Sequence, residues 1–401
     1  MLFAVWLMFG VLGVPIKKEL HLTQVQFSWL AAIAVLSGSL GRLPLGILTD
    51  RIGGKLLMTI LLVFTAIPCF LVSHAHTYTQ LLVCAFLLGV AGNSFSVGIA
   101  WNAAWAPPAQ QGFYLGTFGA GNVGASVTKL IGPALIALTP AAGFAGGLVP
   151  GGWRFVPVLY AFILLALAIV TAVAGPSPDR NPGRTRSLSA MLSPLRRVRV
   201  WRFGLYYVVV FGAYVALSIW LPTYYQTVYH LSLSKAALLT ALFIFPASLL
   251  RPVGGWLSDR FGARLVTYAV FAVMLLACVP LCVPDGVWGV HIGLKTCFAL
   301  VEVLGIGMGI GKASVYKYIP TYFPKDVGSV GGLVGTLGAL GGFFLPLGFA
   351  YFASASGKPE SCFWLLLGLI AGCLAWLHLV ITEMRRQEST ELPSSLAGST
   401  G

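Results

Sequence analysis

Two stretches of this sequence share one pattern: GRLPLGILTDRIGGKL at residues 41–56 and RPVGGWLSDRFGARL at residues 251–265. In each stretch an Arg precedes an Asp by eight residues, and the Asp is followed by an Arg, an apolar residue, a Gly and, two positions further, a basic residue. The pairs are Arg42 with Asp50 and Arg251 with Asp259. A pattern that returns in this way predicts two related halves, with a binding site at the interface between them.

The composition places these halves in a membrane. Hydrophobic residues make up 58% of the chain and charged residues 9%, whereas soluble domains carry about 25% charged residues. The net charge is +14, but the basic residues lie between apolar spans, which is how membrane topology is encoded, so no nucleic-acid partner is expected. The seven cysteines form no CxxC or Cys/His cluster, and we expect neither a metal site nor a cofactor.

Twelve apolar stretches approach the roughly 20 residues that cross a bilayer core of about 30 Å. They lie at 1–16, 26–48, 56–73, 79–104, 112–138, 154–175, 203–224, 235–257, 265–284, 289–319, 328–353 and 361–382. The sequence thus predicts an all-α membrane protein with twelve transmembrane helices in two pseudo-symmetric six-helix bundles. The first stretch is short and lacks the features of a signal peptide, so we expect the first helix to be truncated.

A polar segment, PSPDRNPGRTRSLSAMLSPLRRVRV at 176–200, separates the halves. It predicts a linker with a surface helix near 188–200, between bundles at 1–175 and 201–382, and a disordered tail follows at 383–401. If the linker is cytoplasmic, fourteen Lys and Arg residues lie on its side of the membrane and six on the other. This bias predicts a multi-pass protein of the cytoplasmic (inner) membrane with both termini in the cytoplasm.

Several motifs together resemble a known family. The loop pattern G-x-L-x-D-R-x-G-x-K/R resembles the motif of the major facilitator superfamily. The Gly-rich stretches GTFGAGNVGASVTKLIGP (116–133) and GTLGALGGFFLP (335–346) echo each other and resemble the paired signatures of its nitrate/nitrite porter family. GIAWNAAWAPPAQQG (98–112) and GKASVYKYIPTYFPKDVGS (311–329) extend the resemblance over nearly the whole chain. The resemblance implies the major facilitator fold, transport of nitrate and nitrite, and a monomer.

Arg42 and Arg251 are the residues expected to hold the anion. Each lies eight residues from its loop Asp, about 12 Å along a helix, and therefore near the middle of the bilayer core. A charge at that depth costs at least about 2.5–3.5 kcal/mol, and no acidic residue lies within either helix to neutralise it. Two such cations need an anion between them, and the planar guanidinium donates paired bonds to planar oxyanions such as nitrate.

The fifth and eleventh helices are expected to bring polar and Gly-lined surfaces to the anion. Asn122 lies about 15 Å into its helix, where its amide could donate to the same anion. The resemblance places the turn from Gly119 to Asn122 beside the anion. Gly121, Gly338 and Gly341 belong to smooth helix faces that permit tight packing and the sliding of the halves.

Aromatic side chains are expected to flank the anion. Tyr207 and Phe211 lie one turn apart on the seventh helix and share a face. The resemblance gives aromatics at these positions a place beside the anion, although core packing also explains Phe211. On the fourth helix the matching residue is Phe95, with Ser94 as the alternative.

The inner gate and the coupling path involve other charged residues. Asp50, Arg51, Asp259 and Arg260 lie in tight loops and are expected to form a charge latch between helix ends. The coupling candidates are Glu302 paired with Lys129 in the outer third, and Lys312, which would add positive potential on the inner part of the tenth helix.

We therefore expect a secondary active transporter that takes up nitrate, and nitrite, together with protons. The stretches TKLIGP and GKASVYK resemble the proton-linked branch of the family. The alternatives are a nitrate/nitrite antiporter, an organophosphate or organic-anion carrier, and a nitrate sensor that does not transport. No enzyme is expected, because the sequence offers no Ser/His/Asp set, no paired carboxylates in a span and no phosphate-binding loop.

Overall fold

The computed structural model describes residues 1–140, 142–144, 149–180, 182–283 and 292–397. Within these ranges the chain is helical, apart from loops and one isolated bridge between Phe144 and Val149. Short 3₁₀ or π-helical pieces, labelled η, interrupt several helices.

The elements before the linker follow the predicted apolar stretches closely. They are α1 (Leu2–Trp6), α2 (Phe9–Glu19), α3 (Gln24–Leu40), α4 (Arg42–Ile52), α5 (Gly54–Ser73), α6 (Tyr78–Gly89), η1 (Val90–Asn93), α7 (Ser94–Trp105), η2 (Pro108–Gln110), α8 (Gln111–Ala120), η3 (Gly121–Val123), α9 (Gly124–Leu138), η5 (Gly152–Arg154) and α10 (Phe155–Ala174). Consecutive pieces such as α3 with α4 and α6 with α7 continue one another and form single long spans.

The remaining elements begin in the linker. They are α11 (Leu188–Leu192), η6 (Ser193–Arg196), α12 (Val198–Tyr207), η7 (Val208–Gly212), α13 (Ala213–Tyr229), α14 (Leu233–Leu249), α15 (Arg251–Phe261), α16 (Ala263–Leu281), α17 (Leu294–Tyr322), α18 (Val327–Ser356) and α19 (Ser361–Ala397). The surface helix expected near 188–200 is thus divided into three short pieces. The last helix continues to Ala397, through residues for which the sequence predicted a disordered tail.

Ten helices among the described residues are long and apolar enough to cross a membrane. Two of the twelve predicted stretches, 1–16 and 112–138, are not among the ten. The first corresponds to α1 and α2 and the second to α8, η3 and α9, each interrupted by a turn. The all-helical membrane architecture is confirmed, whereas the count of twelve spans and the truncated first helix stay predictions.

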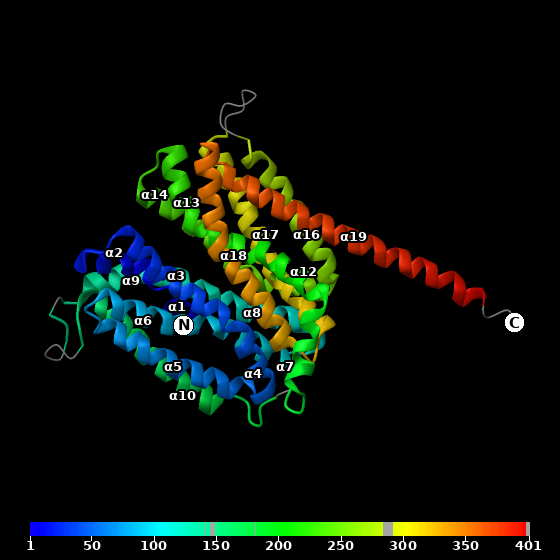
Figure 1. Cartoon of the computed structure of the whole chain (residues 1–401), viewed down its shortest axis with the longest axis horizontal. Helices are drawn as coiled ribbons and strands as arrows, with labels where there is room; N and C mark the ends of the chain where they lie inside the picture. Colours follow the sequence, from blue (N-terminus) through cyan, green and yellow to red (C-terminus); the bar gives the residue numbers. More distant parts are fainter. Residues whose placement is uncertain (141, 145–148, 181, 284–291, 398–401) are drawn as a thin grey trace.

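The two parts of the sequence occupy different sides of the molecule (Figure 1). The blue and cyan helices α1–α10 lie together on one side, and the green to orange helices α12–α18 lie on the other, with α19 projecting outward. The two sides contact each other through two pairs of helices, which we call the crosswise contacts: α4 packs on α18, and α15 packs on α8.

These crosswise contacts bring helix backbones together. A Cβ atom built on Gly46 would lie 2.1 Å from the carbonyl oxygen of Gly328, and one built on Gly255 would lie 2.0 Å from that of Gly112. Only glycine allows so close an approach. Glycines at these crossings therefore let α4 pack closely on α18 and α15 pack closely on α8.

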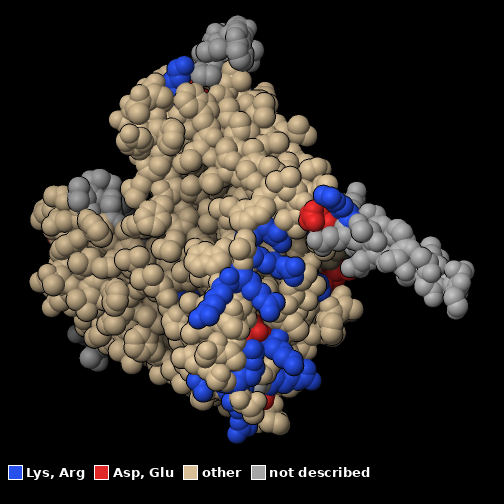
Figure 2. All heavy atoms as spheres, turned by 45° about the vertical axis from the view of Figure 1, so that its right-hand side comes forward, with Lys and Arg blue, Asp and Glu red and all other residues tan. Residues whose placement is uncertain are grey.

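The linker defines one end of the molecule, which we call the linker end. There the Asp179 carboxylate accepts hydrogen bonds from the Lys55 amide at 2.7 Å and from the Trp101 indole at 3.0 Å. The Gly183 amide donates to the Asp50 carbonyl at 2.8 Å. In Figure 2, most of the Lys and Arg side chains on the visible face gather towards this end.

Both helices that carry the repeated motif begin at a break. α4 starts with Arg42 directly after Gly41, and α15 starts with Arg251 directly after Leu250. A proline follows each Arg closely, and proline cannot donate the backbone hydrogen bond that would continue the preceding helix (Pro44 and Pro252). Each arginine therefore begins a new helical segment inside a longer span.

The packing of Gly254 gives a test of this architecture. A Cβ atom there would lie 2.4 Å from the Ile310 carbonyl oxygen on α17, whereas one at Gly372 on α19 would meet nothing within 4 Å. We expect Gly254→Ala to destabilise the purified protein by about 1–3 kcal/mol through overpacking. Gly372→Ala is the control, since alanine favours a helix by about 1 kcal/mol over glycine. Thermal unfolding in detergent measures both, and equal midpoints for the two variants would contradict the close crossing of α15 and α17.

Candidate anion site

Two fully buried arginines lie at the centre of the molecule. The exposed fraction is 0% for Arg42 and 1% for Arg251. Each is the first residue of a helical segment that continues the preceding helix, α3 or α14.

Several hydrogen-bond donors of the two arginines have no partner. Arg42 donates from Nε to the Gly38 carbonyl at 3.1 Å and from Nη1 to the Gly335 carbonyl at 3.0 Å, while its Nη2 has no partner. Arg251 has no hydrogen-bond partner for Nε or Nη1. In the described part of the chain, no ion pair includes either residue.

The ring of Phe95 contacts both arginines. The Cζ atom of Arg251 is 5.0 Å from the centroid of the Phe95 ring, and that of Arg42 is 5.6 Å from it. Such contacts stabilise a cation through the negative face of the ring. Phe95 is thus the residue of the fourth predicted helix that meets the arginines, whereas Ser94, the alternative, is buried and shows no hydrogen bond to them among the described contacts.

The two aromatics predicted on the seventh helix join the same cluster. The Tyr207 ring stacks on Phe211 at 5.0 Å and lies 6.4 Å from the Phe95 ring, and Phe211 lies 5.6 Å from the Arg42 Cζ atom. The backbone at Val208–Gly212 forms a π-helical turn. Turns of this kind recur at functional sites because they rotate side chains within a helix.

Lys312 is a third buried cation in this cluster. It is 0% exposed, its Nζ donates to the Ala247 carbonyl at 2.9 Å, and it lies 3.1 Å from the Tyr214 ring centroid and 5.9 Å from that of Phe211. The sequence predicted only a general positive potential on the inner part of its helix. The structure places it in the cluster because α17 packs against η7.

Several buried donors around the two arginines have no partner. They are Arg42 Nη2, Arg251 Nε and Nη1, Tyr207 Oη and Ser96 Oγ. Asn122 Nδ2, in η3, is a further buried donor without a partner. A buried donor left unpaired costs about 1–3 kcal/mol, and few are left so in folded proteins. All of these groups can donate a hydrogen bond, which is the complement of an acceptor-rich anion.

The predicted glycines have distinct positions around the cluster. A Cβ on Gly119 would lie 2.4 Å from Arg251 Nε, and one on Gly338 would lie 2.3 Å from the Tyr207 ring. Gly341 packs on η7, where a Cβ would lie 3.3 Å from the Gly212 Cα atom. A Cβ on Gly121 would meet nothing within 4 Å. The lack of a side chain at Gly119 and Gly338 therefore leaves room for the Arg251 guanidinium and the Tyr207 ring.

Some residues of the cluster were not predicted. Trp6 lies 5.3 Å from Arg42 Cζ, and Tyr316 contacts the rings of Tyr207 at 4.7 Å and Phe95 at 5.2 Å. Tyr316 follows Lys312 by four residues, so its place on the same helix face was open to prediction. The role of Trp6 was not, because its segment gave only a short apolar stretch.

Carboxylates join the two sides of the molecule at the linker end. Asp50, at the end of α4, accepts a hydrogen bond from the Gly328 amide at 2.9 Å, in the first turn of α18. Asp259, at the end of α15, accepts from the Gly112 and Phe113 amides at 2.8 Å each, in the first turn of α8. The positive ends of two helices thus bind the two carboxylates of the repeated motif.

One arginine of the expected latch, Arg260, is exposed and stacks over Trp256 and Phe261 at 5.6 and 5.4 Å. The base that meets Asp259 is Lys317, whose Nζ lies 2.6 Å from its carboxylate. We call the contacts of Asp50 with Gly328, and of Asp259 with α8 and Lys317, the linker-end latch.

The predicted pair of Glu302 and Lys129 is only half described. Glu302 is partly buried, and its Oε1 has no hydrogen-bond partner. The Lys129 side chain lies outside the described residues, so their pairing stays a prediction. Glu302 precedes Lys312 by ten residues on α17, about 15 Å along the helix, which separates it from the arginine cluster.

Comparison with known proteins places the chain in a family. It matches the model of the Major Facilitator Superfamily over residues 1–346, with a second match over 236–399. It is 60% identical to a probable nitrate/nitrite antiporter of Thermus thermophilus, covering 98% of this chain and 91% of that protein. It is 32% identical to a nitrite extrusion protein of Bacillus subtilis, covering 89% and 85%. Among solved structures, the fucose:proton symporter of E. coli superposes with a TM-score of 0.70 at 16% identity, covering 94% and 96%, which shows the fold alone.

The contact of Gly119 with Arg251 predicts the effect of one added methyl group. Gly119→Ala should displace the Arg251 guanidinium, because the new Cβ would lie 2.4 Å from Nε and 2.5 Å from Cζ. We expect nitrate binding, measured by isothermal titration calorimetry, to weaken at least about tenfold, the equivalent of one charge-assisted hydrogen bond. Gly121→Ala, two residues further along the chain, should bind within about twofold of the unchanged protein, because its methyl group meets no protein atom within 4 Å. Equal affinities for the two variants would remove Gly119 from the site.

Proposed function

Because this chain belongs to the nitrate/nitrite porter family of the major facilitator superfamily, we propose that it is a secondary active transporter of nitrate, with nitrite as a second substrate. It moves the anion by alternating access, with Arg42 and Arg251 as the main ligands. Phe95, Tyr207, Phe211 and the Asn122 amide complete the site.

The observation that carries this proposal is the set of unpaired donors around two buried arginines. A planar monovalent oxyanion offers acceptors to both guanidinium groups at once. Such an anion also neutralises the charge of the two arginines, which take part in none of the described ion pairs. Phe95 and Phe211 bound the space on their faces, which favours a small ligand over an organic anion or a phosphate ester.

The proposed organisation follows from the repeat. Residues 1–175 and 201–382 form the two six-helix bundles that move relative to one another, 176–200 is a cytoplasmic linker, and 383–401 is a cytoplasmic tail. The linker end faces the cytoplasm, and the protein acts as a monomer in the inner membrane. The bias of Lys and Arg towards the linker supports this orientation.

The linker-end latch is the proposed inner gate. Its contacts join α4 to α18 and α15 to α8, which come from different bundles. Opening the cytoplasmic side requires that these hydrogen bonds break. Since Arg42 and Asp50 lie on one helix, as do Arg251 and Asp259, an anion that draws the arginines together also acts on the latch.

Two modes of coupling are open to this site. In proton-coupled uptake, Glu302 carries the proton, because it is a partly buried carboxylate with an oxygen that has no partner, and Lys312 and Lys129 set the local potential. In exchange, nitrate moves one way and nitrite the other, and no titratable group is needed. Similarity to the probable nitrate/nitrite antiporter of Thermus thermophilus supports exchange as the second candidate.

Labelled nitrate uptake into proteoliposomes tests the function. We expect uptake by the reconstituted protein and its loss in the variant Arg42→Ala/Arg251→Ala. Proton-coupled uptake predicts stimulation by an inward proton gradient and no need for internal nitrite. Exchange predicts the reverse: uptake that requires internal nitrite and ignores the gradient. Failure of folded protein to take up nitrate in every condition would refute nitrate transport, and binding without uptake would indicate a sensor.

Glu302→Gln tests the coupling residue, because Gln keeps the shape of Glu but cannot titrate. If Glu302 carries the proton, the variant should lose most of the gradient stimulation while nitrate binding stays unchanged. Glu360→Gln is the control, since it removes another buried carboxylate from the same half. An uptake-against-pH profile equal to that of the unchanged protein would assign Glu302 a structural role.

A further inference from the structure

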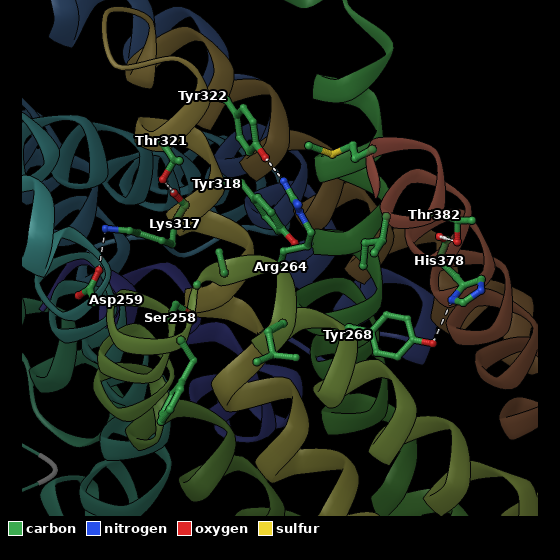
Figure 3. Close-up of a pocket in the computed structure, with 16 residues that line it drawn as sticks. Ser258, Asp259, Arg264, Tyr268, Lys317, Tyr318, Thr321, Tyr322, His378 and Thr382 are labelled. Atoms are coloured by element: carbon green, nitrogen blue, oxygen red, sulfur yellow. Dashed lines mark hydrogen bonds and ion pairs between the residues drawn. The ribbon is translucent and has the colours of Figure 1, made fainter. Parts of the chain in front are cut away.

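Two adjoining cavities lie in the second half of the chain, at and above the linker end. The first has a volume of about 840 Å³ and lies between α15, α16, α17 and α19 (Figure 3). The second has a volume of about 490 Å³ and runs along α15, α16 and α17. Phe261 and Leu265 line both cavities, so the two meet. We call them the polar cavity and the apolar groove.

Basic side chains surround the polar cavity on its α16 and α12 sides. Arg264 lines it and donates from Nη2 to the Tyr322 hydroxyl at 2.9 Å (Figure 3). Arg202 lines a small recess that shares Arg264 and Tyr322 with the cavity, and Arg199 stacks on the Tyr322 ring at 4.6 Å. The positive charge of three arginines is thus collected at one edge of the cavity.

Two of the groups at this edge have unused hydrogen-bonding capacity. Tyr318 is 4% exposed, lines both the cavity and the recess, and its hydroxyl has no partner. The Arg202 Nε is buried and also has no partner. The carboxylate in the lining, Asp259, is already bonded to Lys317 and to the α8 amides. These two groups give the edge hydrogen-bonding capacity for an anionic ligand.

The apolar groove has the length and position of a lipid tail. It includes Leu265 near the start of α16 and Val273 two turns further, and these side chains are 60% and 47% exposed. From Arg264 to Val273 the helix rises about 14 Å, close to the half-thickness of about 15 Å of a bilayer core. An exposed apolar surface at this depth faces lipid.

We propose that the polar cavity and the apolar groove together bind one anionic phospholipid. Its phosphate is held by Arg202, Arg264 and the Tyr318 hydroxyl, and one acyl chain lies in the groove. Because lipid tails are as apolar as the groove, the tail contributes little free energy and the headgroup sets the selectivity. Basic pockets between membrane helices suit anionic headgroups in this way. The occupied cavity borders the linker-end latch, since Asp259 and Lys317 line it.

Lipid retention by the purified full-length chain tests this site without any transport. The protein is mixed in neutral detergent with phosphatidylglycerol or with phosphatidylcholine of the same acyl chains, and native mass spectrometry gives the affinity of each. We expect phosphatidylglycerol to bind about tenfold more tightly. Arg202→Gln/Arg264→Gln should weaken its binding about thirtyfold, because each Arg near a membrane surface contributes about fivefold. Tyr318→Phe, which keeps the ring, should weaken it about fivefold.

Arg180→Gln is the matched control. It removes the same charge at the linker end, where Arg180 stacks on Trp105 away from the cavity. Its phosphatidylglycerol affinity should equal that of the unchanged protein. Equal binding of the two lipids, an equal loss in the control, or no loss in either cavity variant would each refute the site. Displacement of the lipid by millimolar inorganic phosphate would identify a site for free phosphate instead.

Discussion

The structure depends on two guanidinium groups that lie buried in a membrane protein without a carboxylate beside them. Each costs at least about 2.5–3.5 kcal/mol at that depth. The surroundings offset part of this cost through the aromatic rings of Phe95 and Phe211 and through backbone carbonyls that accept from Arg42. The remaining donors are unpaired. In the proposed function an anion completes the site, and without it the like charges of the arginines oppose close contact between the two sides of the molecule.

The same two helices carry the anion ligands and the latch. α4 begins with Arg42 and reaches Asp50 about 12 Å further on, and α15 repeats this arrangement with Arg251 and Asp259. Because a short helix moves as a rigid unit, displacement at one end reaches the other. α18 contacts both ends of α4, through Gly335 at Arg42 and Gly328 at Asp50. α8 contacts both ends of α15, through Gly119 at Arg251 and Gly112 at Asp259.

Much of this arrangement could be predicted because membrane burial restricts the sequence so strongly. The stretch 79–104 was predicted as one helix, and α6, η1 and α7 occupy Tyr78–Trp105. Irregular turns were not predicted, because the π-helical turn at Val208–Gly212 and the breaks before Arg42 and Arg251 leave hydropathy unchanged. The partners of Asp50 and Asp259 were missed for another reason. Their partners are backbone amides at helix starts, which any residue type can supply, so the sequence does not reveal them. A neighbouring Arg is visible in the sequence and was therefore taken as the partner.

The sequence by itself determined the membrane class and the repeated motif, and it predicted the depth of Arg42 and Arg251, because hydropathy and helical rise act along one chain segment at a time. Only the tertiary structure decided that Phe95 contacts both arginines, that Lys312 lies against Phe211 and that Lys317 meets Asp259. These contacts connect residues of different helices. Their geometry depends on how closely the glycine faces allow the backbones to approach, and that distance is set by packing in three dimensions.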